Sequence, residues 1–131
     1  MRIEQALISY LTNNTALVAL VAKRIYAFHS PADTVFPFVT YQRVSSEKFL
    51  TLDQPINDLA IARIQFDIFS DRYSDGLAVL DALRDALQGY QGAMSTMKVQ
   101  AVLPALEQHI DLPEMDYYRI TVDYRIFHRE E

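Results

Sequence analysis

The stretch LAIARIQFDIFSDRYSDGLAVLDALRDALQGY, residues 59–90, decides the fold. Its first part alternates two kinds of side chain, with Ala62, Ile64, Phe66 and Ile68 on one face and Arg63, Gln65, Asp67 and Phe69 on the other. Such alternation is typical of an antiparallel sheet that is covered on one face only. We therefore predict a strand whose apolar face lies in the core.

The second part of this stretch predicts an amphipathic helix that covers the strand. Apolar residues recur every three or four positions, at Leu77, Leu80, Leu83 and Leu87. Polar residues fall mainly off that stripe: Asp75, Asp81, Arg84, Asp85 and Gln88. Ser70 or Asp71 is the predicted N-cap, and Gly89 the predicted residue after the C-cap. Burial of each leucine would contribute about 1.5–3 kcal/mol before the opposing conformational entropy is subtracted.

Composition limits the class of protein. The 131 residues, half of them hydrophobic and 22% charged, fit one globular domain over residues 1–131. There is no cysteine, which excludes a disulfide, a thiol nucleophile and a cysteine zinc site. The net charge of −5 argues against a nucleic-acid partner held through phosphates. With no signal-peptide pattern and no apolar run of about 18 residues, we expect a soluble cytoplasmic protein without membrane contact.

The remaining elements follow from periodicity and turn residues. Before the central strand we predict a helix over 2–12, a short helix over 16–23 capped by Thr15, a strand at 24–26, a loop over 29–37, a strand over 38–49 and an irregular long loop at about 46–58. After the helix we predict a connector over 91–98, an edge strand over 99–105 around Pro104, a loop over 108–116 and a last strand over 118–127. The fold class is α+β, a mainly antiparallel sheet of about four to five strands with the amphipathic helix and the N-terminal helical segment packed on one face.

Catalytic patterns are missing from this sequence. The histidines His29, His109 and His128 fall in predicted loops or near a chain end, without the spacing of metal ligands. Asp81 and Asp85 form a solvated pair on the polar helix face. With only three glycines there is no phosphate-binding loop and no nucleophile elbow. We expect no catalytic, cofactor or metal site, and hence no enzyme.

Surface residues are the better candidates for function. The polar sides of two strands carry mixed charge with aromatic residues near their ends: Arg63, Asp67, Phe69, Arg119, Asp123, Arg125 and Phe127. This pattern fits either a solvated sheet face or a self-complementary contact between subunits. The long loop carries apolar residues, among them Phe49 and Leu50, and either packs against its own domain or contacts a partner.

Several segments carry a family resemblance through their order and spacing. They are ALVALVAKRIY after the opening helix, PFVTYQRVS after the proline loop, TLD in the long loop, ARIQFDIFSDRYSDGLAVLDALRDAL and the closing YYRITVDYRIFHREE. Together they resemble the bacteriophage tail-completion proteins, also described as tail terminators or head–tail joining proteins of long-tailed phages.

The resemblance implies a structural role without a cofactor. Family members are expected to assemble in the host cytoplasm as a ring of six copies at the tail–head junction, where the ring caps the finished tail tube and meets the head-completion or connector protein. Contacts with the tail tube protein or a neighbouring copy would come from the long loop, through Glu47, Phe49, Leu50, Asp53 and Asn57. Two alternatives stay open: a small α+β ligand-binding or regulatory module with a pocket among Tyr26, Tyr41 and Tyr118, and a small hydrolase or isomerase built around His109 or His128.

Overall fold

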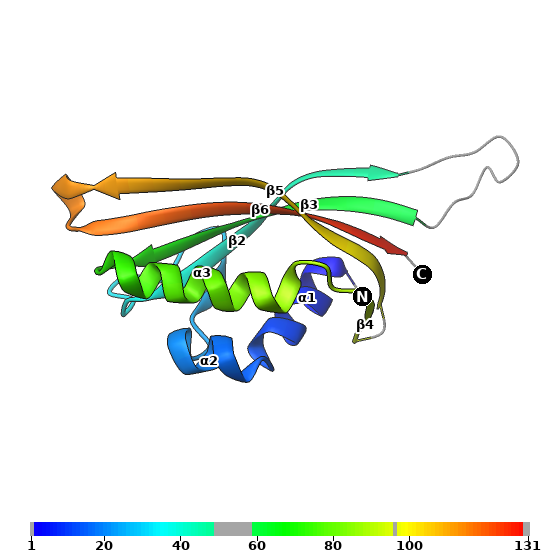
Figure 1. Cartoon of the computed structure of the whole chain (residues 1–131), viewed down its shortest axis with the longest axis horizontal. Helices are drawn as coiled ribbons and strands as arrows, with labels where there is room; N and C mark the ends of the chain where they lie inside the picture. Colours follow the sequence, from blue (N-terminus) through cyan, green and yellow to red (C-terminus); the bar gives the residue numbers. More distant parts are fainter. Residues whose placement is uncertain (1, 49–58, 96, 130–131) are drawn as a thin grey trace, which may run out of the picture.

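A six-stranded sheet carries three helices on one of its faces (Figure 1). The computed structural model describes residues 2–48, 59–95 and 97–129. The helices are α1 (Ile3–Thr12), α2 (Thr15–Val21) and α3 (Tyr73–Leu87). The strands are β1 (Ile25–Ala27), β2 (Phe38–Lys48), β3 (Leu59–Ser70), β4 (Gly92–Met94), β5 (Met97–Leu112) and β6 (Tyr117–Arg129), and a 3-10 turn, η1, spans Pro113–Met115.

The strand order is β1-β2-β3-β6-β5-β4. All neighbouring strands are antiparallel except β1 and β2. The predicted class, α+β with a mainly antiparallel sheet and helices on one face, is confirmed (Figure 1). The predicted number of strands was too low, because the segment assigned as a connector over 91–98 contains β4 and the turn into β5. Strand β4 has three residues, of which Met94 alone is buried, so its sequence shows no alternation.

The predicted loop over 108–116 was wrong for most of its length. Strand β5 continues to Leu112, and only η1 and Asp116, in the left-handed conformation, form the turn into β6. Most residues of β5 beyond Val102 are exposed because this part of β5 has no further strand beside it. A polar edge strand has the composition of a loop, which explains the error.

The first residues of the loop predicted at about 46–58 belong to a strand. Strand β2 extends to Lys48, so Glu47 is a strand residue that pairs with Ile61 of β3. Residues 49–58 lie outside the described residues, and with them four of the five predicted loop contacts: Phe49, Leu50, Asp53 and Asn57.

Helix caps were predicted less well than the helices. Asn14, not Thr15, caps α2, with its side-chain oxygen accepting a hydrogen bond from the Leu17 backbone N–H at 3.0 Å. The N-cap of α3 is Arg72, without a side-chain bond, rather than Ser70 or Asp71. Ser70 continues β3 instead and is fully buried. The prediction for Gly89 is confirmed: this residue follows the C-cap with φ +76°.

The core lies between the sheet and the helices. The four apolar residues predicted to face inward from β3 are all buried: Ala62, Ile64, Phe66 and Ile68. Leu80, Leu83 and Leu87 of α3 are buried against them, and Leu77 is partly buried. Met94 and Met97 are also core residues. Helix α3 approaches the sheet closely at Gly76, where a Cβ atom would lie 2.6 Å from Ser70 Oγ.

Candidate assembly surface

The helices cover one face of the sheet (Figure 1), and we call the opposite face the open face. It carries the predicted charged residues. Cross-strand pairing of β3 with β6 sets Arg63 beside Arg125, Asp67 beside Thr121 and Phe69 beside Arg119. Asp123 and Phe127 follow the same alternation along β6. The structure therefore brings all seven predicted interface residues onto one face: Arg63, Asp67, Phe69, Arg119, Asp123, Arg125 and Phe127.

Two carboxylates of the open face are buried beneath arginine side chains. The Arg63 guanidinium donates two hydrogen bonds to Asp123 Oδ2, at 2.6 and 3.1 Å. Asp67 accepts from Arg119 at 3.2 Å and from the Thr121 hydroxyl at 2.7 Å. Asp123 is 3% exposed and Asp67 7%. Buried charges require such partners, so these bonds hold the arginine side chains in place within the face.

An aromatic cluster closes one end of the open face. Phe38 stacks on Phe69 with ring centroids 5.0 Å apart, and Phe36 and Tyr117 pack beside them. The Arg119 guanidinium lies 5.9 Å from the centre of the Phe69 ring. This end of the face is a packed apolar surface rather than a row of solvated side chains.

The part of the open face formed by β5 and β6 has exposed side chains with few partners in the described part of the single chain. Arg125 is exposed and makes no ion pair with the described residues. Its cross-strand neighbour Leu103 and the nearby Leu106 are 48% and 47% exposed. Glu47, the one described residue of the predicted loop contacts, lines a hollow of about 150 Å³ with Arg63 and Arg125. An exposed cation among exposed leucines is typical of a surface that binds another protein.

Sequence reasoning missed a chain of polar contacts that links α3 to β5. Tyr73 Oη lies 2.7 Å from His109 Nδ1, and His109 Nε2 lies 2.8 Å from Glu107. Glu107 in turn accepts a hydrogen bond of 2.9 Å from Arg84. His109 was predicted in a loop, whereas it is a strand residue. The alternation of Glu107, His109 and Asp111 with Leu106 and Ile110 was the available signal.

The same contacts set the ionisation of Glu107. Its hydrogen bond to His109 is the largest cause that lowers the pKa of this carboxyl from 4.5. Burial opposes the shift, and the hydrogen bond to Arg84 adds a further lowering. Both partners stabilise the carboxylate form. Glu107 is therefore a charged link between the helix and the edge strand.

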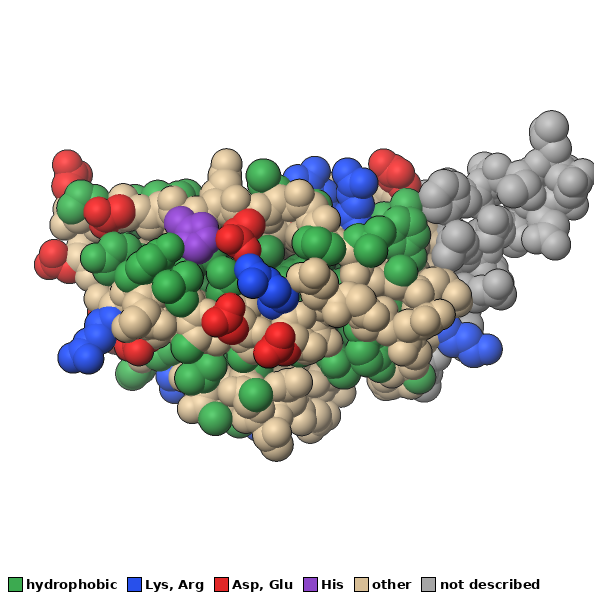
Figure 2. Space-filling view, viewed as in Figure 1, with side chains coloured by type: hydrophobic (Ala, Val, Ile, Leu, Met, Phe, Trp, Pro, Cys, Tyr) green, Lys and Arg blue, Asp and Glu red, His purple; other side chains and the backbone are tan. Residues whose placement is uncertain are grey.

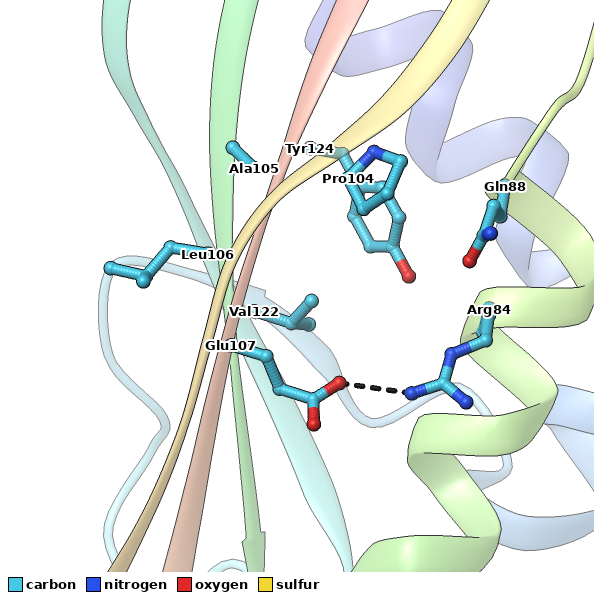
Figure 3. A pocket seen from close by; sticks show the side chains of 8 residues that line it. All are labelled: Arg84, Gln88, Pro104, Ala105, Leu106, Glu107, Val122 and Tyr124. Atoms are coloured by element: carbon cyan, nitrogen blue, oxygen red, sulfur yellow. Dashed lines mark hydrogen bonds and ion pairs between the residues drawn. The ribbon is translucent and has the colours of Figure 1, made fainter.

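A pocket of about 400 Å³ lies beside this chain of contacts, between α3 and β5 (Figure 3). Arg84 and Gln88 line it from the helix, Pro104 and Glu107 from β5, and Tyr124 from β6. The Tyr124 side chain is 1% exposed, and its hydroxyl points into the pocket without a hydrogen-bond partner among the described residues. Burial raises the pKa of this hydroxyl, so it is a neutral donor.

Two alternatives from the sequence, a ligand-binding module and a small hydrolase or isomerase, depend on residues whose positions the structure describes. They hold no group of three His, Asp or Glu side chains that could bind a metal ion. His128 is not at a loose chain end but buried in β6. Tyr118 lines a pocket with Tyr73 and His109. Strands β2 and β3 lie between β6, which carries Tyr118, and β1, which carries Tyr26. Within the described ranges, helices long and apolar enough to cross a membrane are absent.

This chain was compared with protein families, curated proteins and solved structures. The model of the family described as "Tail completion protein gp17" matches residues 5–129. A chain of the solved structure described as "Virion of native gene transfer agent (GTA) particle" has the same fold, with a TM-score of 0.81 and 17% sequence identity over 98% of this chain and 95% of that chain. A search of curated proteins found no match.

The chain is an α+β domain with paired charges fixed on an open sheet face. The chain belongs to the tail completion protein gp17 family, which confirms the resemblance seen in the sequence. It is therefore a structural protein of a phage-type tail.

Proposed function

We propose that this protein caps the finished tail tube and joins it to the head connector, as a ring of six copies. Family membership supports a role in completing the tail. The similar fold of a chain from a gene transfer agent virion supports a place in a phage-like particle. Assembly in the host cytoplasm and a final position at the tail–head junction are part of the same proposal.

The open face is the single observation that carries the proposal of a repeated contact. Its two buried carboxylates fix Arg63 and Arg119, so these side chains lose little further freedom when another surface covers them. Leu103 and Leu106 add apolar area that water covers in the single chain. A face with fixed charges and uncovered leucines fits a subunit contact through Arg63, Asp67, Phe69, Arg119, Asp123, Arg125 and Phe127.

The tube contact is assigned to the segment that follows β2. Glu47 is exposed at the end of β2 and borders the open face. Phe49, Leu50, Asp53 and Asn57 come after it in the sequence. We expect a variant carrying Phe49→Asp and Leu50→Asp to fold normally but no longer to attach to tails. Normal attachment would refute this assignment.

Deletion of the gene from the parent phage or prophage tests the function. Electron microscopy of the lysate should reveal filled heads without tails, beside free tails of irregular or excessive length. Uniform tails on joined virions would contradict the proposal. Complementation with Leu106→Asp should fail, whereas Met115→Asp, which changes another exposed apolar residue at η1, should restore joined virions.

A further inference from the structure

We propose that the pocket between α3 and β5 receives Arg125 of the next copy in the ring. This inference rests on the proposed function and names the surface that the open face contacts. The pocket and Arg125 lie on opposite sides of the sheet, so they meet only between two chains.

The pocket presents a polar group that has no hydrogen-bond partner among the described residues and belongs to a side chain that is 1% exposed. The Tyr124 hydroxyl is aimed into it and bonds no described residue, while the exposed Gln88 amide stands at its mouth (Figure 3). Pro104 and Val122 line the pocket with apolar atoms. A long side chain with an apolar stem and several hydrogen-bond donors fits this combination.

The surroundings of the pocket favour a cation. Asp81 and Asp85 are exposed on α3 close to Arg84, and Glu107 adds a further carboxylate that lines the pocket from β5. Arg84 is the one basic residue of α3, and both Glu107 and Asp81 lie within ion-pair distance of it. Figure 2 shows acidic side chains on both sides of a basic one between the sheet and the helices. The excess of carboxylates attracts positive charge.

Arg125 has the properties of the occupant. The other two arginines on the β3–β6 part of the open face are bonded to Asp123 and Asp67, whereas Arg125 makes no ion pair with described residues. Its guanidinium carries five donors on a long stem, which suits the Tyr124 oxygen, the Gln88 carbonyl and the Glu107 carboxylate. Leu103 and Leu106 would be covered in the same contact.

The contact is head-to-tail, since one copy uses its open face and the next copy its helix side. Such heterologous contacts generate closed rings when the rotation between copies divides a full turn. A two-fold dimer would instead bring the same surface of both copies together. The proposal therefore predicts a ring contact rather than a symmetric pair.

Thiol cross-linking in assembled particles tests the contact, because the chain has no cysteine of its own. Asp85→Cys on α3 and Leu103→Cys beside Arg125 are combined in one chain and treated with a short bifunctional maleimide. We expect a ladder of cross-linked copies. A chain with Leu103→Cys and Ser9→Cys, an exposed residue of α1, is the matched control and should stay monomeric. Particles that incorporate the first variant but yield only monomer would overturn the proposal, as would cross-links to the tube protein alone.

A charge exchange gives a second, independent result. Arg125→Glu should lower the yield of joined virions about tenfold or more, because it sets an acidic group against an acidic surface. Gln88→Arg in the same chain should restore the yield, since Gln88 lies at the mouth of the pocket. Absence of rescue, in a double variant that melts like the wild type, would count against the contact. If deletion of the gene leaves virions normal, the proposed function is wrong, but the contact between copies is not yet decided. Cross-linking of the concentrated purified chain then tests that contact separately.

Discussion

Arg63 and Asp123 lie on neighbouring strands of the open face, and the guanidinium of Arg63 holds a carboxylate that is almost completely buried. Two hydrogen bonds of 2.6 and 3.1 Å end on the same oxygen, Oδ2, while Oδ1 is buried without a hydrogen-bond partner. Asp123 thus depends on one side chain for its charge compensation. This pair therefore lies at the centre of the charge balance of the open face.

Replacing Arg63 by methionine should destabilise the single chain. The change leaves Asp123 buried without its partner, and breaking a buried ion pair in this way costs about 3–5 kcal/mol. We expect about 2–3 kcal/mol here, because the Arg63 side chain is 33% exposed and water can replace part of the interaction. Urea unfolding measures the difference.

Arg125→Met is the matched control for this measurement. Arg125 pairs with Arg63 across the strands but makes no ion pair with described residues. Its replacement should change the free energy of unfolding by less than about 0.5 kcal/mol. Equal losses for both variants would mean that the Arg63 bond to Asp123 contributes nothing specific.

Gly76→Ala should destabilise the fold through one short contact. A Cβ atom at this position would lie 2.6 Å from Ser70 Oγ and 3.2 Å from Ile120 Cδ1, so these side chains or α3 must shift. Overpacking of this kind costs about 1–3 kcal/mol. Adding Ser70→Ala removes the closest atom, and the double variant should recover part of the loss. Strict additivity in unfolding experiments would show that Ser70 is not the obstacle.

Glu107→Gln should remove a pH-dependent part of the stability. The pKa of Glu107 is lowered in the folded chain, so its charge stabilises the fold above the ordinary value of 4.5 and stops doing so as the pH falls through the lowered pKa. The melting temperature of the variant should lie below that of the wild type at pH 7, and the two should converge in acid. Glu114→Gln, at an exposed carboxylate of η1, should match the wild type at pH 7. A gap that widens in acid would contradict this account.

Tyr124→Phe separates assembly from folding. The hydroxyl makes no hydrogen bond to a described residue, so its loss should change the free energy of unfolding by less than about 0.5 kcal/mol. The variant should nevertheless give fewer joined virions than the wild type, because the seated guanidinium would lose an acceptor. A large loss of stability would show that the hydroxyl already supports the single chain.

Periodicity predicted the elements that face the core and failed where the edge of the sheet begins. The alternation around Ile64 and the leucine repeat of α3 come from burial on one side, which sequence records directly. His109 was misplaced because an edge strand has the polarity of a loop. The open-face residues were grouped correctly, but the burial of Asp67 and Asp123 depends on cross-strand register, which one sequence does not encode locally.

The position of the chain in the virion tests the central claim most directly. A His-tagged copy that restores joined virions in the deletion strain can be labelled with nickel–nanogold and imaged by electron microscopy. A protein that caps the tube and joins it to the head should place gold at the tail–head junction alone. Gold along the length of the tail, or at its far tip, would contradict the account.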